Sequence, residues 1–194
     1  MFDAGVVEIC RPYLDLVSEE GEFDHAFRRR LHDEIQESTR LDHWGSYLRL
    51  SAASAVKAWP IWESRFPTGL PVASPIGGAI PERPELDLTS EPQELGRLNT
   101  FLDNKFQLGA DYFPAISAGF ACWAVNRDVI EGGFSVDPDA GDLDIDPEAW
   151  DPSLYAAIAI GGGAVWEESG DSEARRNFWF WYLSDAVPRF YSGQ

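Results

Sequence analysis

A run of carboxylates in the second half of the chain is the first feature that could bind a cation. Seven acidic residues lie in VDPDAGDLDIDPEAWD, residues 136–151, and this stretch contains no Lys or Arg. Carboxylates in proteins coordinate metal ions, act as acid–base pairs and attract basic protein surfaces. The candidate residues, together with the tryptophan beside them, are Asp137, Asp139, Asp142, Asp144, Asp146, Glu148, Trp150 and Asp151.

The spacing of these aspartates can be compared with that of a calcium loop, whose ligands occupy fixed positions. Asp142, Asp144 and Asp146 supply oxygens at positions 1, 3 and 5 of such a loop. Position 6, which requires glycine for a sharp turn, is Pro147, and position 12, which requires glutamate, is Ser153. We therefore expect no metal and no cofactor. A solvated loop and a docking surface for a basic partner remain as interpretations.

Elsewhere the chain contains no set of residues with the spacing of a known catalytic site. His25 and His32 would share a helix face, but no HExxH motif accompanies them, and we expect two exposed polar rings. Residues 161–163 are Gly-Gly-Gly without the Lys-Ser/Thr of a phosphate-binding loop, which favours close helix packing. The protein is therefore predicted not to be an enzyme.

Charge and cysteine usage indicate the compartment and the classes of partner. The net charge of −18 over 194 residues repels phosphate backbones, so nucleic acid is excluded as a direct partner. Cys10 and Cys122 form no CxxC motif, which fits a reducing cytoplasm. The N-terminus lacks a basic leader, and the longest apolar run, residues 154–166, is too short to cross a membrane. We expect a soluble cytoplasmic protein; the oligomeric state stays open.

Apolar residues recur at intervals of three and four along most of the chain, which is typical of amphipathic helices. Helices are predicted over residues 6–17, 23–35, 47–59, 95–106, 112–130, 154–166 and 173–191. In the second of these Arg28, Arg29 and Arg30 are expected to face solvent, and Pro60 is expected to end the third. The small residues of 112–130 predict a central helix. Asp151-Pro152 supplies an N-cap and a proline at the first helical position for the helix over 154–166.

The order of these elements predicts one all-α domain over residues 1–194, a bundle of about seven helices. Two irregular stretches interrupt it: a Pro-rich connection over 67–92 and an acidic loop over 131–151. In the last helix, Trp179 and Leu183, with Ala186 and Phe190, are predicted to form the main core stripe. Arg175 and Arg176 are predicted to bind carboxylates or helix-terminal carbonyls.

Three helical segments resemble the all-α immunity proteins of bacterial polymorphic toxin systems, specifically immunity-protein family five. They are AASAVKAWPIWESRFP at 52–67, YFPAISAGFACWAVNRDV at 112–129 and SLYAAIAIGGGAVWEESGDSEARRNFWFWYLSDAVP at 153–188. The resemblance implies a non-enzymatic protein that binds and neutralises a cognate toxin inside the cell. The acidic stretch suits a basic toxin, with a nuclease as the first hypothesis. We expect that changing Asp142, Asp144 and Asp146 to Asn weakens toxin binding and leaves folding intact.

An alternative function is a small-molecule-binding or enzymatic helical domain. Its pocket would combine buried tryptophans with Arg175 and Arg176 and a carboxylate of Glu167 or Glu168. A deep pocket with convergent polar groups would favour this alternative. A solid core with an exposed acidic ridge would favour the inhibitor.

Overall fold

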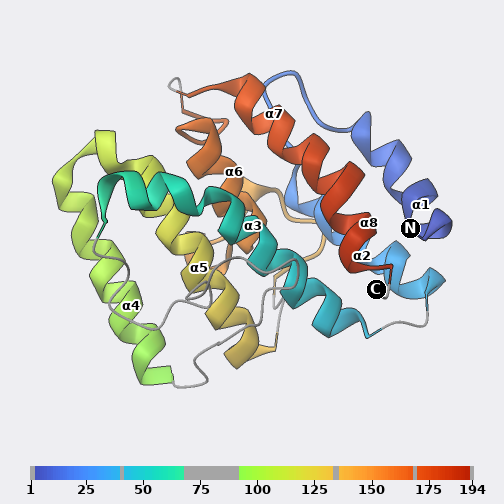
Figure 1. The fold of residues 1–194 in the computed structure, drawn as a ribbon, viewed down its shortest axis with the longest axis horizontal. Coiled ribbons are helices and arrows are strands. Elements are labelled where there is room, and N and C mark those ends of the chain that lie inside the picture. The colour runs from blue at the N-terminus through green and yellow to red at the C-terminus, as the bar shows by residue number, and fades with distance from the viewer. Residues whose placement is uncertain (1–2, 40–41, 68–91, 133–135, 168–169, 193–194) are drawn as a thin grey trace.

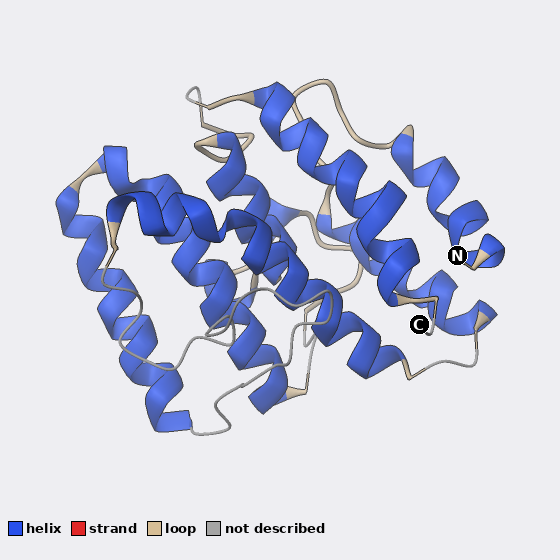
Figure 2. Cartoon of the chain, viewed as in Figure 1, coloured by secondary structure: helices blue, strands red, loops and turns tan. Residues whose placement is uncertain are grey.

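The fold of the described residues is entirely helical. The structure, a computed structural model, describes residues 3–39, 42–67, 92–132, 136–167 and 170–192. Within these ranges every regular element is a helix and no strand occurs (Figure 2), which confirms the predicted all-α class. Residues 68–91 of the predicted Pro-rich connection lie outside the described residues.

The α-helices follow the predicted order with shifted ends. Their bounds are α1 Ala4–Leu14, α2 His25–Ser38, α3 His43–Arg65, α4 Pro92–Lys105, α5 Phe113–Glu131, α6 Pro152–Gly161, α7 Ser172–Trp181 and α8 Val187–Phe190. Short 3₁₀ turns cover Phe106–Leu108, Ala110–Tyr112, Asp142–Asp144 and Pro147–Ala149. Figure 1 shows α4 at one end of the molecule and α1 with α2 at the other.

Helix α5 runs through the middle of the fold, as predicted. Nearly every residue from Ala115 to Asp128 is buried, and the helix packs against α3, α4 and α6. The neighbouring helices approach α5 closely at Gly119, where a Cβ atom would lie 2.5 Å from Leu102 Cδ2 and 2.8 Å from Trp62 Cζ3. A side chain at this position would therefore collide with the core.

Pro60 does not end α3, contrary to the prediction. The helix continues to Arg65 with Pro60 inside it. Trp62 is fully buried beyond the proline, and its ring centroid lies 6.2 Å from that of Phe101 in α4. We infer that this packing outweighs the hydrogen bond that proline cannot donate, since tertiary contacts routinely override local preference.

Helix α6 begins as predicted and ends earlier. Asp151 accepts hydrogen bonds from the backbone N–H groups of Ser153 and Leu154, so it caps the helix that Pro152 begins. The helix ends at Gly161, five residues before the predicted end at residue 166, because Gly162 adopts the left-handed region at φ 71°. Close packing is confirmed at Gly161, where a Cβ atom would lie 2.1 Å from Arg175 Cγ.

The chain ends in one continuous helical stretch, because a π turn over Tyr182–Ala186 joins α7 to α8. The turn precedes Pro188, whose ring would collide with the carbonyl of Ser184 in regular α geometry. Trp179, Leu183 and Ala186 are buried, which confirms their predicted place in the core, whereas Phe190 is only partly buried against it. None of the helices described is both long and apolar enough to span a membrane.

Candidate functional site

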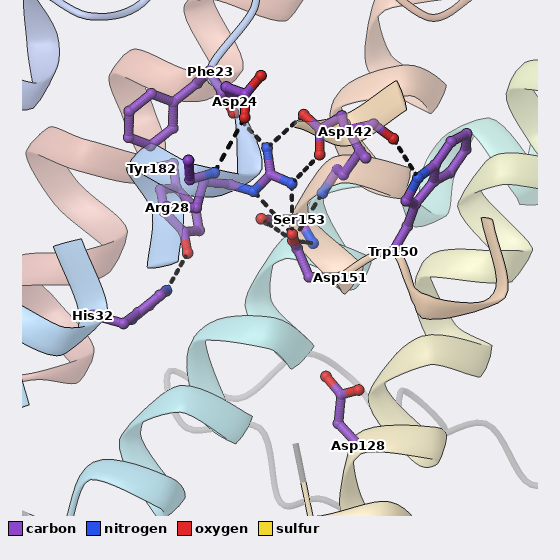
Figure 3. A network of polar contacts seen from close by, with 12 residues as sticks. Phe23, Asp24, Arg28, His32, Asp128, Asp142, Trp150, Asp151, Ser153 and Tyr182 are labelled. Atoms are coloured by element: carbon purple, nitrogen blue, oxygen red, sulfur yellow. Dashed lines mark hydrogen bonds and ion pairs between the residues drawn. The ribbon is translucent and has the colours of Figure 1, made fainter. Parts of the chain in front are cut away.

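The acidic segment, residues 136–151, wraps around a buried arginine from α2. Arg28 donates to both carboxylate oxygens of Asp142, at 3.0 and 2.6 Å, and through Nε to Asp151 Oδ2 at 2.8 Å. Its Nη1 also donates to the backbone carbonyl of Phe23. Figure 3 shows the guanidinium between the two carboxylates. Every edge of the guanidinium therefore faces an acceptor.

This cluster corrects three expectations at once. Arg28 was expected to face solvent, and Asp142 and Asp151 were expected on a surface, yet all three are at most 5% exposed. On α2, Arg28 lies three residues after His25 and four before His32, and all three belong to the buried face of the helix. A residue far away in the sequence thus supplies the positive charge that the acidic segment lacks.

The arginine and the aspartates of the cluster stabilise each other's charged forms. Burial alone would lower the pKa of Arg28, but Asp142 and Asp151 raise it above its ordinary value. Burial would likewise raise the pKa of Asp151, but Arg28 and the hydrogen bonds from Ser153 hold it below its ordinary range. Arg28 and Asp151 are therefore ionised at neutral pH, and the cluster is a buried ion pair with an extra carboxylate.

Three side-chain donors, one of them within the segment itself, also hold the backbone of the acidic segment in place. Three donors reach three of its carbonyls: Trp150 Nε1 to Asp142 at 3.0 Å, Tyr155 Oη to Pro147 at 2.6 Å, and Arg127 Nη1 to Glu148. The segment has little regular structure of its own, so these bonds and the Arg28 cluster fix its path. Its outer side chains are consequently presented from an ordered backbone.

A second buried ionic group supports the hydrogen bond from Arg127 to the carbonyl of Glu148. Arg127 Nη2 lies 2.6 Å from Asp128 Oδ1, and Tyr47 Oη donates to Asp128 Oδ2 at 2.8 Å. Burial raises the pKa of Asp128, with Arg127 and Tyr47 acting in the opposite direction. We assign this group a structural role, because Arg127 is committed both to Asp128 and to the carbonyl of Glu148.

The outer side of the segment carries the remaining carboxylates. Exposed acidic side chains occur at Asp137, Asp139, Asp144, Asp146 and Glu148. Leu143 among them is 70% exposed. The surface continues onto the loop before α2, where burial, helped by Asp24 and Asp142, raises the pKa of Glu22. The result is an acidic ridge beside α2, defined here as the five exposed carboxylates of the segment.

The histidines form no metal site. His25 and His32 are buried, which corrects the expectation of exposed rings. The two ring nitrogens of His32 each lie 3.0 Å from a tyrosine hydroxyl, those of Tyr191 and Tyr182. Burial lowers the pKa of His32 to about 4, so the ring is neutral at physiological pH. No group of three or more metal-binding side chains is assembled in the described parts of the chain.

The arginine-lined pocket of the alternative hypothesis is not formed by Arg175. Its guanidinium donates to the backbone carbonyls of Glu20 and Gly163. These carbonyls lie in the loops that follow α1 and α6, so Arg175 binds carbonyls, as predicted, but not those of a helix end. Arg176 lies over the Phe180 ring instead, and Glu168 is outside the described residues. A pocket of about 300 Å³ does lie nearby, between α4, α5, α6 and the acidic segment. Its walls are mostly apolar and include six aromatic rings, and its charged residues are acidic.

Comparison with protein families gives a match over residues 16–189 to the immunity protein Imm5. The chain belongs to the Imm5 family. This confirms the resemblance to immunity-protein family five, and the protein is therefore an immunity protein. The match includes Arg28, the whole acidic segment and the aromatic pocket. No curated protein matches the chain significantly.

The residues predicted to bind a partner divide into two sets in this Imm5 protein. Asp142 and Asp151 face inward to Arg28, and Trp150 is half-buried with its indole N–H bound to the backbone. The other five carboxylates face solvent. Arg28 was missed because a run of three arginines suggests a solvated face. The available signal was its spacing on α2, which places it in line with Leu31 and Ile35.

Proposed function

We propose that this Imm5 protein binds a cognate toxin through the acidic ridge and neutralises it by covering a surface that the toxin needs. Membership of an immunity-protein family suggests a non-enzymatic role. Binding the toxin would be sufficient to neutralise it. The toxin would carry a basic face, and a nuclease is the first candidate, because nucleases hold phosphate backbones with Lys and Arg. The alternative of a small-molecule enzyme loses the arginines on which it depended.

The observation that carries this proposal is the rigid support of the exposed carboxylates. Arg28 fixes both ends of the inner part of the segment, at Asp142 and Asp151. Donors from the core fix the carbonyls between them. A surface that is ordered before binding loses less conformational entropy when the partner docks. Like charges on such a surface also speed the approach of a cationic protein.

The test uses two exposed carboxylates that take no part in the buried cluster. Asp144→Asn and Asp146→Asn are combined in one variant, since asparagine can still cap the turn that Asp146 begins. The matched control, Glu8→Gln with Glu37→Gln, removes two charges from exposed positions on α1 and α2. The association rate with the toxin encoded by the adjacent gene is measured against salt concentration.

We expect the association rate constant of the D144N/D146N variant to be at least about threefold lower than that of the parent at low salt. The difference should shrink as salt screens the charges. The E8Q/E37Q control should stay close to the parent. If both variants lose the same rate, net charge alone explains the effect and the ridge is not the docking surface. Equal rates for parent and D144N/D146N at every salt concentration would contradict the proposal directly.

A further inference from the structure

The aromatic pocket beside the acidic ridge is a chain of rings open to solvent. Neighbouring ring centroids in this chain lie 5.4–5.8 Å apart. Its six aromatic walls are Phe106, Phe113, Phe120, Trp150, Tyr155 and Trp166. Phe106 is 43% exposed and Trp166 is 39% exposed. Large aromatic side chains left exposed around a pocket are typical of protein-binding hot spots.

The charge around the pocket has one sign. Asp103 of α4, Glu148 of the acidic segment and Glu167 after α6 line it, and each of these residues is exposed. Among the described residues that line the pocket, none is basic. Glu167 is held in place because its Oε2 accepts a hydrogen bond from the backbone N–H of Ala164 at 2.9 Å. The pocket thus combines flat apolar walls with fixed negative charge.

The pocket is continuous with the acidic ridge. Glu148 belongs to both, and Pro147 and Trp150 of the acidic segment line the pocket. Its volume of about 300 Å³ is at the lower limit for a ligand site, which suits one long side chain better than a large cofactor. A partner lying across the ridge would therefore pass over this opening.

We propose, resting on the proposed function, that the pocket receives an arginine side chain of the toxin. A guanidinium is planar and weakly hydrated, so it stacks on aromatic rings such as those of Trp150 and Trp166. Its N–H groups would meet the carboxylates of Asp103, Glu148 and Glu167, which supply acceptors and opposite charge. An aliphatic or aromatic occupant would use the walls and leave the negative charge of the three carboxylates unmatched.

The chemistry of the pocket is tested first on the isolated chain. N-acetyl-arginine amide is titrated while the indole N–H signals of Trp150 and Trp166 are followed by NMR. The comparison ligand is N-acetyl-citrulline amide, which has the same length and no charge. We expect arginine amide to shift both signals until they saturate. Citrulline amide should bind with an affinity at least about tenfold lower. The variants D103N/E167Q and W166A should weaken arginine amide binding, and E8Q/E37Q should not.

Equal binding of the two amides, or no shift with either, would overturn the arginine assignment and leave the acidic ridge proposal intact. The same variants are then measured in the toxin complex. We expect D103N/E167Q to raise the dissociation rate about tenfold or more, while E8Q/E37Q stays near the parent. Glu167→Gln retains an acceptor for Ala164, so folding is preserved. If D103N/E167Q dissociates like the parent while D144N/D146N still slows association, the toxin binds the ridge and not the pocket.

Discussion

Removing the positive charge of Arg28 is predicted to destabilise this fold more than removing the charge of any other arginine in α2. In Arg28→Met, the carboxylates of Asp142 and Asp151 remain buried without their common counter-ion. Asp151 keeps its hydrogen bonds from Ser153 and Leu154, but Asp142 loses both contacts to the guanidinium. Removing one partner of a buried ion pair costs about 3–5 kcal/mol. This is a large part of the 5–15 kcal/mol that typically stabilises a domain.

The sign of the pH dependence follows from the same contacts. The pKa of Asp151 lies below its unfolded value in the parent because Arg28 outweighs burial. Its stabilising contribution is therefore present above about pH 4 and is lost as the pH falls below that value. Without Arg28, burial raises the pKa, so the carboxylate takes up a proton at higher pH in the folded state. The deficit of R28M should be largest at pH 7 and should shrink towards pH 4.

Urea unfolding followed by tryptophan fluorescence at pH 7 and pH 5 measures these differences. The matched control is Arg29→Met, which removes the partly exposed pair of Arg29 with Asp33 at 3.1 Å and should cost about 0.5 kcal/mol or less. The triple variant R28M/D142N/D151N carries no buried charge at this site and should recover much of the loss. An R28M variant that is no less stable than R29M would refute the structural role of the cluster.

Three further predictions concern the core. Trp179→Ala should cost about 3–5 kcal/mol in urea unfolding, because the side chain is 1% exposed; an unchanged midpoint would remove Trp179 from the core. His32→Gln should flatten the pH dependence of stability between pH 6.5 and the folded pKa of about 4, because within this window the unfolded state takes up the proton first. The parent should lose up to about 3 kcal/mol there, and equal slopes for parent and H32Q would contradict the assignment. Gly119→Ala should destabilise by about 1–3 kcal/mol, since its Cβ would collide with the core. Gly96→Ala, in open space on α4, should stabilise by up to about 1 kcal/mol through helix propensity, and thermal melting that ranks the two variants the other way would refute this reasoning.

Local signals in the sequence were sufficient for the helices and for much of the core. The capping pair Asp151-Pro152 predicted the start of α6, and the small residues around Gly119 predicted the central helix. These features depend on neighbours in the chain, so periodicity and capping rules detect them. Pro60 shows the limit of such rules, because Trp62, which follows it in α3, packs against Phe101 of α4 and Gly119 of α5, far away in the sequence.

The candidate site was predicted only in part, because its decisive contact is long-range. Arg28 and Asp142 are 114 residues apart, and no local pattern pairs them. The sequence showed where negative charge accumulates but not which carboxylates point inward. The aromatic pocket was missed for the same reason, since its walls come from residues as far apart as Phe106 and Trp166. Clusters of this kind appear only when the helices are placed together.

The separation of inner from outer carboxylates explains how one short segment can carry so much charge. Asp142 and Asp151 share Arg28, so their repulsion is offset inside the protein. The outer carboxylates remain solvated, where water and salt screen them. The expectation that D142N/D144N/D146N would leave folding intact does not fit this arrangement, because Asp142 belongs to the buried set. Changes at Asp142 should therefore act on stability, whereas changes at Asp144 and Asp146 should act on the encounter with the toxin.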